Sequence, residues 1–353
     1  MATSANKDFI LALEAIEKEK DISKEVMLAA VENSILQACK NEFGKADNIK
    51  VSINPETGAV SVYAEKLIVE EVIDEVTEIT LDEAKNKFPR KKLAVGDAVN
   101  IEITPKNFQR ISAQKAKSAV VQKVREEERR VLYEQYSQVE HEVLTGIVQR
   151  YVGGNININL GKADALLAES EQIPTEHFRP TERIKVYVLE VKNTPKGPRI
   201  SVSRTHKELV RRLFEAEVTE VHEGIVEIRS IAREAGARTK MAVWSNDPGV
   251  DAIGACVGVN GARVNAIVDE LRGEKIDIIN WSDDPAELIR NALSPSQVVS
   301  VDVDEYEKSA RVIVPDFQLS LAIGKEGQNA RLAARLTGYK IDIKSESQAE
   351  AGY

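Results

Sequence analysis

The apolar residues among the first 43 positions of the chain recur at the spacing of an α-helix. Residues 6–20 and 24–43 are therefore predicted to form two helices. Ser23 is placed to cap the start of the second helix, and Gly44 is placed to end it. One face of that helix carries small and apolar side chains at helical spacing: Met27, Ala30, Val31, Ser34, Ile35 and Ala38.

Shorter apolar runs and two charged blocks come next. Residues 49–53 and 60–64 are predicted to form two strands, because they flank a turn that contains proline and glycine. An acidic stretch at 65–83 is followed by a basic stretch at 85–92. Adjacent blocks of this kind usually form a solvated face, and docking to a partner is the alternative. Residues 110–137 then predict one long charged helix.

From Val143 onward the apolar period changes from that of a helix to that of a strand. Residues 155–160 alternate strictly between asparagine and an aliphatic residue, as expected of a strand with one buried face. Further strands are expected at 143–150, 163–167, 184–191 and 199–203. Several short strands in succession predict a small closed β-barrel of the OB type over residues 138–204.

Two segments in the second half of the chain share one pattern. Residues 253–271 contain Gly-Val-Asn-Gly between two apolar stretches, and Lys-Ile-Asp-Ile follows at 275–278. Residues 319–336 contain Gly-Lys-Glu-Gly in the same setting, and Lys-Ile-Asp-Ile follows at 340–343. A single Gly-x-x-Gly is a weak signal, but two copies in one frame of helix, corner, helix and strand are a strong one. This frame is typical of a KH domain.

The glycines of this motif suit a corner that binds phosphate. Gly258, Gly261, Gly324 and Gly327 carry no Cβ atom, so the chain can turn sharply and its backbone can approach a ligand closely. The amides and the start of the following helix then present partial positive charge. The alternative is a corner that joins two helices without a ligand. Bases would lie on an apolar groove floor supplied by six residues: Ile253, Val257, Val264, Leu319, Ile323 and Leu332.

Side chains around the two corners complete the predicted RNA site. The first corner offers Val259 and Asn260, and the second offers Lys325 and Glu326. Because neither pair has a net positive charge, binding is expected to depend on backbone amides and on flanking polar groups. These flanking groups are Arg263, Gln328, Asn329, Arg331 and Arg335. The alternative for each arginine is an ordinary solvated position on a helix.

The charge balance narrows the class of nucleic acid. The chain has a net charge of −9, and none of its predicted domains is strongly basic. Non-specific binding to duplex DNA is therefore not expected to be its main task. Single-stranded RNA remains compatible, because amides and aromatic side chains can bind it with little net charge. In the barrel, Tyr151 and Phe178 are candidates for stacking on bases, with a structural role as the alternative.

The rest of the composition indicates a cytosolic, globular protein of several domains. The chain has 353 residues, of which 42% are hydrophobic and 30% charged. No apolar run reaches the roughly 18 residues that a membrane helix needs, and the N-terminus does not resemble a secretory signal. The two cysteines, Cys39 and Cys256, lie in apolar surroundings and are expected to be buried, reduced thiols.

Several strings in the sequence resemble the NusA family. Residues 108–117 are similar to the start of its linker helix, and 254–263 to its first KH domain. Residues 281–286 are similar to the junction between its KH domains, and 322–333 to its second KH corner. The resemblance covers about residues 5–345.

The resemblance implies a multidomain α+β protein. Residues 1–137 would form an N-terminal RNA polymerase-binding domain with helices, strands and a long linker helix, and residues 138–204 an S1-type OB-fold. Residues 205–281 and 282–345 would form two tandem KH domains of the prokaryotic type, followed by a disordered tail at 346–353. Some members carry C-terminal acidic repeats; this chain stops soon after its second KH segment, so contacts made by such repeats are not expected.

The resemblance also implies a role in transcription. Members dock on core RNA polymerase near the RNA exit channel and bind the nascent single-stranded RNA. The outcome is pausing, intrinsic termination or, with other factors, antitermination. By the match to the linker motif, Arg110 and Lys117 become candidates for contacting the exiting RNA, and a solvated helix face is the alternative for each. A monomer without membrane contact is expected.

No catalytic motif emerges from the sequence. The four histidines are scattered and lack metal-binding spacing, and neither Gly-Lys pair has the flanking residues of a P-loop. No catalytic residue, metal or cofactor is therefore predicted. An exoribonuclease that carries S1 and KH modules would need a large catalytic core, for which the predicted segments leave no room. A ribosome- or messenger-associated RNA-binding module without polymerase contact remains an open alternative.

Overall fold

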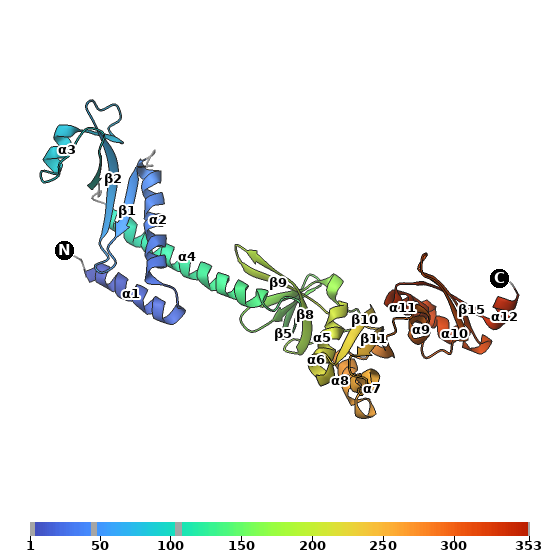
Figure 1. Cartoon of the computed structure of the whole chain (residues 1–353). Helices are drawn as coiled ribbons and strands as arrows, with labels where there is room; N and C mark the ends of the chain where they lie inside the picture. The colour runs from blue at the N-terminus through green and yellow to red at the C-terminus, as the bar shows by residue number, and fades with distance from the viewer. Residues whose placement is uncertain (1–3, 44–47, 103–107, 352–353) are drawn as a thin grey trace. The chain divides into compact units, whose positions relative to one another are not determined.

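A computed structural model of the chain describes residues 4–43, 48–102 and 108–351 (Figure 1). The chain divides into two compact units, Met1–Val131 and Leu132–Tyr353. Within the described ranges, no helix combines the length and the apolar character needed to cross a membrane.

The first unit is built on helices that pack against a sheet. Its main elements are α1 Ser4–Lys20, α2 Lys24–Phe43, β1 Ile49–Ile53, β2 Val60–Val69 and the first part of α4 Phe108–Ser137 (Figure 1). Met27, Val31 and Ile35 of α2 are buried in the core between these elements, as their helical spacing predicts. Cys39 lies in the same core and is 1% exposed.

The far half of β2 belongs to a second, smaller core. It pairs with β3 Glu78–Thr80 and β4 Ala98–Glu102, and α3 Leu81–Lys87 covers this part of the sheet. Thr80 begins α3, because its side chain accepts a hydrogen bond from Glu83 N at 3.3 Å. The buried residues here are Ile68, Ile79, Ala84, Val99 and Ile101.

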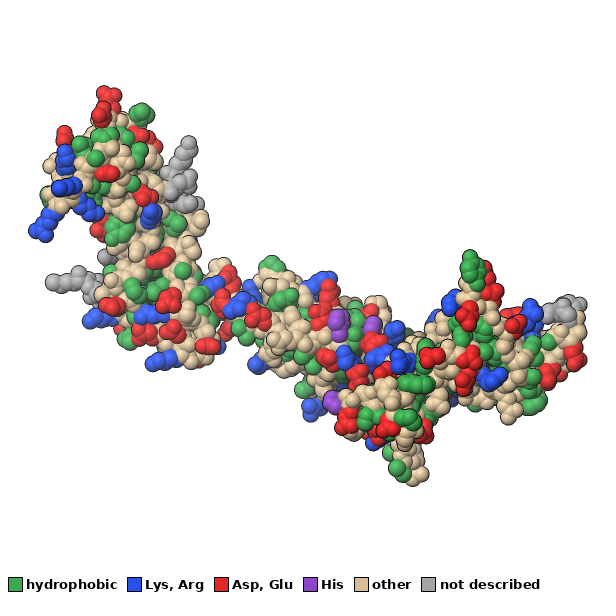
Figure 2. Space-filling view, in the orientation of Figure 1, with side chains coloured by type: hydrophobic (Ala, Val, Ile, Leu, Met, Phe, Trp, Pro, Cys, Tyr) green, Lys and Arg blue, Asp and Glu red, His purple; other side chains and the backbone are tan. Residues whose placement is uncertain are grey.

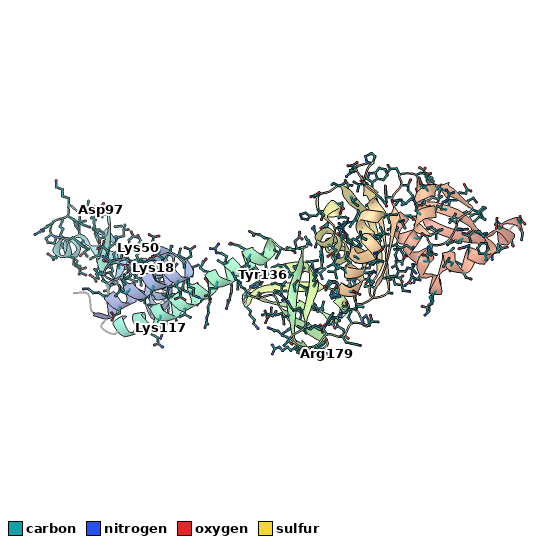
Figure 3. All side chains as sticks on the ribbon, turned by 90° about the horizontal axis from the view of Figure 1, so that it is seen from below. Lys18, Lys50, Asp97, Lys117, Tyr136 and Arg179 are labelled. Carbon is teal, nitrogen blue, oxygen red and sulfur yellow. The ribbon has the colours of Figure 1, made fainter. Side chains whose placement is uncertain are left out.

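The second unit begins with the predicted barrel. Its strands are β5 Val143–Val152, β6 Asn155–Asn159, β7 Asp164–Leu167, β8 Arg183–Thr194 and β9 Gly197–Ser203. They close in the order β5-β6-β7-β9-β8, with only the β7–β9 pair parallel. A short helical turn, η1 Glu169–Glu171, follows β7. Tyr136 at the end of α4 packs against the barrel core and donates a hydrogen bond to Leu160 O at 3.0 Å (Figure 3).

One glycine is required inside the barrel. A Cβ atom at Gly146 of β5 would lie 2.2 Å from Ile158 Cγ2 and 2.9 Å from Leu160 Cδ2. Ile158 is fully buried, so it has no room to move aside. The alternating pattern along the strands therefore positions the barrel core, and Gly146 lets β5 approach that core closely.

Two modules follow the barrel, and they share the order helix, two strands, helix, corner, helix and strand. The first contains α5 Lys207–Glu217, α6 Thr219–His222, β10 Val226–Glu234, β11 Arg238–Ser245, α7 Ala252–Val257, η2 Val259–Gly261, α8 Ala262–Glu270 and β12 Lys275–Asn280. The second contains α9 Pro285–Ala292, β13 Ser300–Asp304, β14 Ser309–Val314, η3 Asp316–Gln318, α10 Leu319–Ile323, η4 Lys325–Gly327, α11 Gln328–Thr337 and β15 Lys340–Ser345. In each sheet the first two strands are antiparallel and the last pair is parallel. This is the predicted KH fold of the prokaryotic type.

The second KH module covers the outer face of the first module's sheet. Ala232, Ala242 and Ile279 of the first sheet belong to the hydrophobic core of the second module, against α9 and α11. Lys240 of β11 lies in the same interface with a side chain that is 0% exposed. Its ammonium donates to Ser294 O at 2.8 Å and forms an ion pair with Asp277 at 3.0 Å.

The end of the chain differs from the predicted disordered tail. Residues 346–350 form a short helix, α12 Glu346–Glu350. Ser345 and Gln348 form a capping box at its start, with Ser345 N donating to Gln348 Oε1 at 3.1 Å. Ser347 N also donates to Asp316 Oδ1 at 3.2 Å, so a tertiary contact holds this helix.

Candidate nucleic-acid interface

The two Gly-x-x-Gly corners have the same backbone conformation. Gly258 has φ and ψ of 74° and 174°, and its counterpart Gly324 has 75° and 171°. Gly261 has 78° and 13°, and its counterpart Gly327 has 75° and 13°. All four φ values lie in the left-handed region that favours glycine. Each corner therefore turns the chain from one helix into the next in the same way.

The middle residues of each corner are exposed. Val259 is 83% exposed, and Asn260, Lys325 and Glu326 are also classed as exposed. Asn260 and Glu326 have φ values of 51° and 55°, which asparagine tolerates better than glutamate does. In the part of the chain that the structure describes, no acid forms an ion pair with Lys325. The second corner therefore presents one cation that no ion pair neutralises.

The two glycines of a corner have different tasks. A Cβ atom at Gly258 would lie 2.8 Å from Arg263 Cγ, and one at Gly324 would lie 2.8 Å from Asn329 Cβ. A side chain at the first glycine would therefore clash with the helix that follows it. A Cβ atom at Gly327 would meet only Arg331 Nη1, at 3.9 Å. Gly327 therefore faces open space that a ligand can enter, whereas a Cβ atom at Gly261 would lie 3.1 Å from Asn265 Nδ2.

Arg263 and Asn329 occupy equivalent places and brace their corners from within. Arg263 Nη1 donates to Ala255 O at 2.7 Å and to Glu220 Oε2 at 2.9 Å. Asn329 is 3% exposed, and its Nδ2 donates to Ala322 O at 3.0 Å and to Leu293 O at 3.1 Å. The amide of Asn329 is therefore buried and occupied within its module, and its contact with RNA stays a prediction.

The other flanking side chains converge on one carboxylate. Arg331 Nε donates to Glu234 Oε1 at 2.5 Å, and Gln328 Nε2 donates to Glu234 Oε2 at 2.9 Å. Arg335 forms an ion pair with the same carboxylate at 3.7 Å. The hydrogen bond from Arg331 holds the pKa of Glu234 below its ordinary value. The structure therefore pairs both predicted RNA-binding arginines of α11 with an acid from β10 of the preceding module.

The apolar groove floor is only partly as predicted. Ile253, Val257, Val264 and Leu319 are half-buried, as expected of a floor that a base can contact, and Ile323 is 37% exposed. Leu332 is 0% exposed and belongs to the module core, so its predicted place in the groove is wrong.

Two exposed apolar residues beside this groove escaped the sequence analysis. Phe317 of η3 is 79% exposed, and Leu321 of α10 is 45% exposed. They extend the apolar surface of the helix that leads into the second corner. The sequence shows only that both residues are apolar and lie near other apolar residues. This pattern fits a buried position as well as an exposed one, so it could not identify them.

The two aromatic candidates of the barrel differ in accessibility. Tyr151 is 49% exposed, and its hydroxyl donates to Phe178 O at 2.9 Å. Phe178 is 6% exposed, and the guanidinium groups of Arg204 and Arg272 each lie 5.7 Å from the centre of its ring. Both guanidinium groups already contact the ring of Phe178, which gives this ring a structural role, and its stacking on a base stays a prediction.

Basic side chains that sequence reasoning did not single out lie next to Phe178. A hollow of about 560 Å³ is lined by His177, Arg179, Pro180, Thr181, Glu182 and Arg272. Arg179 is exposed at its rim (Figure 3), whereas Arg272 forms an ion pair with Glu182. Figure 2 shows acidic and basic side chains interspersed over the visible face of the second unit.

Of the two exit-channel candidates, Lys117 is exposed on α4 (Figure 3), and the side chain of Arg110 lies outside the described residues. A hollow of about 580 Å³ on α4 is lined by Lys117, Ser118, Val121, Gln122, Arg125, Glu126 and Arg129. Arg125 and Arg129 therefore add basic groups near Lys117 that the sequence analysis did not name. Among the described residues, no group of three or more His, Cys, Asp or Glu side chains could hold a metal ion.

Four family profiles match the chain in the order of its domains. The "NusA N-terminal domain" profile matches residues 8–130, and the "S1 RNA binding domain" profile matches 138–203. The "NusA-like first KH domain" profile matches 204–281, and the "NusA-like second KH domain" profile matches 285–351.

Proteins with the name "Transcription termination/antitermination protein NusA" are similar to nearly the whole chain. The one from Halalkalibacterium halodurans is 54% identical over 345 residues, which cover 98% of this chain and 90% of the relative. The one from Bacillus subtilis is 54% identical over 344 residues, covering 98% and 92%. The one from Thermus thermophilus is 44% identical over 350 residues, covering 96% and 90%.

Proposed function

The chain belongs to the NusA family of transcription termination/antitermination proteins, and we therefore propose that it docks on core RNA polymerase near the RNA exit channel and holds the nascent single-stranded RNA. The family membership predicted from the sequence is confirmed. The N-terminal unit binds the polymerase, and the S1 and KH domains bind the transcript. The result is longer pausing, intrinsic termination and, with other factors, antitermination. The protein acts without catalysis or cofactor, in the cytosol, as a monomer.

The observation that carries the RNA-binding part is the match between the two corners. Gly261 and Gly327 have the same φ and ψ to within a few degrees, and each begins the helix that follows it. A helix N-terminus presents partial positive charge, and Gly327 leaves open space in front of it. Lys325 adds a full charge at the second corner. A sugar–phosphate backbone fits this chemistry at both corners.

The N-terminal unit distinguishes the proposed function from its alternative. A ribosome- or messenger-associated module would bind RNA through the same S1 and KH domains but would not bind polymerase. Lys117, Arg125 and Arg129 on α4 give this unit a basic surface that an exiting transcript can contact. That surface can contact RNA in either role, so retention on core polymerase is the property that separates the two roles.

The test is transcription in vitro through a hairpin pause site, with core polymerase and the full-length chain. The proposed function predicts that the chain lengthens the pause half-life at least twofold and is retained by immobilised core polymerase. The proposed function is contradicted if the chain is retained by polymerase but does not lengthen the pause. It is also contradicted if the chain is neither retained nor lengthens the pause. RNA binding that persists without polymerase retention favours the ribosome- or messenger-associated module.

A further inference from the structure

Glu234 is the last residue of β10 in the first KH module, and it contacts α11 of the second. Its carboxylate accepts hydrogen bonds from Arg331 and Gln328 and forms an ion pair with Arg335. These three partners stand at positions i, i+3 and i+7 of the helix, so they share one face. This is the helix that starts directly after the second Gly-x-x-Gly corner.

The donors that surround Glu234 are those that would bind a phosphate. Two guanidinium groups and a side-chain amide on one face of a helix match the oxygens of a phosphate as well as those of a carboxylate. Arg331 and Arg335 have side chains that are 44% and 55% exposed, whereas that of Glu234 is 18% exposed. The arginines are therefore open to a ligand from solvent, and the acid lies behind them.

Arg331 also connects Glu234 to the corner itself. Its Nη1 donates to Glu326 O at 3.1 Å, so one guanidinium bridges the carboxylate of one module and the loop of the next. At the first corner the position equivalent to Arg331 is occupied by Asn265, which has no guanidinium to form such a bridge. There Arg263 pairs with Glu220, which belongs to its own module.

We propose that Glu234 competes with RNA phosphate for Arg331 and Arg335, so that the first KH module sets the phosphate affinity of the second. This regulation rests on the proposed RNA-binding function. When a transcript occupies the second corner, the arginines turn from the carboxylate to a phosphate. The contact between the modules weakens at that point only, because their apolar interface and the bond from Ser230 Oγ to Leu336 O, at 2.8 Å, do not involve these arginines.

The test is the isosteric change Glu234→Gln in the full-length chain. The probe is a fluorescein-labelled single-stranded RNA of about 20 nucleotides and mixed sequence, long enough to cover several of the binding sites that such modules offer. We expect binding to be tightened about threefold to tenfold at low salt. Each arginine that gains a phosphate steepens the dependence of log affinity on log salt by about 0.7.

Glu227→Gln is the matched control. Glu227 lies on the same strand, β10, seven positions before Glu234, and pairs with Arg229 at 3.0 Å, so the change removes the same charge without touching the partners of Glu234. A second variant, with Glu234→Gln combined with Arg331→Gln and Arg335→Gln, must lose the gain. A merely structural role for Glu234 would leave the salt dependence unchanged.

Three outcomes overturn the proposal. Glu234→Gln binds no tighter than the unaltered chain, Glu227→Gln gains equally, or the gain survives the loss of both arginines. Failure of the proposed function itself is separate. In that case the unaltered chain does not bind the probe at all.

Discussion

Arg204 Nε donates to Glu176 Oε2 at 3.0 Å, and both side chains of this ion pair are 1% exposed. Arg204 lies between the barrel and the first KH module. Its Nη1 donates to Lys185 O of the barrel at 2.8 Å, and its Nη2 donates to Glu270 O of α8 at 3.0 Å. One buried guanidinium therefore joins the two domains through three partners.

We predict that Glu176→Ala destabilises this junction by up to about 3–5 kcal/mol, because it removes the buried counter-charge of Arg204 and leaves only the half-buried carboxylate of Glu270, 3.6 Å away. The measurement is hydrogen exchange of β8 and β9 in the full-length chain, with and without urea. Glu190→Ala is the control, since Glu190 pairs with Lys192 in the same barrel while 47% exposed. It should cost less than about 1 kcal/mol. Equal protection in both variants would contradict the role assigned to Arg204.

We predict that Gly327→Asp weakens RNA binding at least tenfold, because it adds a carboxylate where the phosphate is expected. Gly338→Asp is the matched control. Gly338 ends the same helix with φ and ψ of 78° and 13°, nearly those of Gly327, and a Cβ atom there meets nothing within 4 Å. Both changes strain the backbone by about 1–2 kcal/mol, so only the position of the charge differs. Similar losses of affinity in the two variants would remove the phosphate from this corner. A change at Gly324 is a poorer test, because its Cβ atom would contact Asn329.

The buried acid Glu274 gives a pH-dependent prediction. Burial by itself would raise its pKa, but hydrogen bonds from Arg233, Thr239 and Gly236 N hold it below the ordinary 4.5. A carboxyl whose folded pKa is lowered stabilises the protein above its unfolded pKa, and this contribution is lost as the pH falls through the folded value. We therefore expect Glu274→Gln to lower the free energy of unfolding at pH 7. The difference from the unaltered chain should shrink as the pH falls below about 4.5. A constant difference across this range in urea titrations would refute the assignment.

The thiols give a chemical prediction. Burial raises the pKa of Cys256 to about 12, and both cysteines are buried. At pH 8 the native chain should therefore not react with an aromatic disulfide reagent, because Cys256 carries almost no thiolate and both thiols are inaccessible. In concentrated urea, two thiols should react. Fast reaction of Cys256 in the native state would show that the first KH core opens readily.

The arrangement of the domains and the two corners could be predicted from local patterns. Strict alternation over 155–160 fixes a barrel strand, and the repeated glycines with their Lys-Ile-Asp-Ile strands fix two modules. Helical spacing in α2 likewise places Met27 in the core. Such patterns have a period of a few residues, so a short stretch of sequence contains the whole signal.

The ion pairs of the candidate site could not be predicted in the same way. Arg331 and Glu234 are 97 positions apart in the chain, and nothing near either one indicates its partner. Phe178 and Leu332 look like surface or groove residues until the neighbouring elements cover them. The helix at 346–350 is too short to be stable by itself, and a contact with Asp316 from another part of the module holds it.

The two KH copies differ in how much they depend on each other, because the outer face of the first KH sheet is buried under the second copy. A cut at the boundary between the copies would expose Ala232, Ala242 and Ile279 to water and remove the carbonyl of Ser294 from the ammonium of Lys240. The leading copy is therefore expected to aggregate when expressed alone. Loss of the trailing copy would expose the same face, so we expect the two copies to fold as one unit.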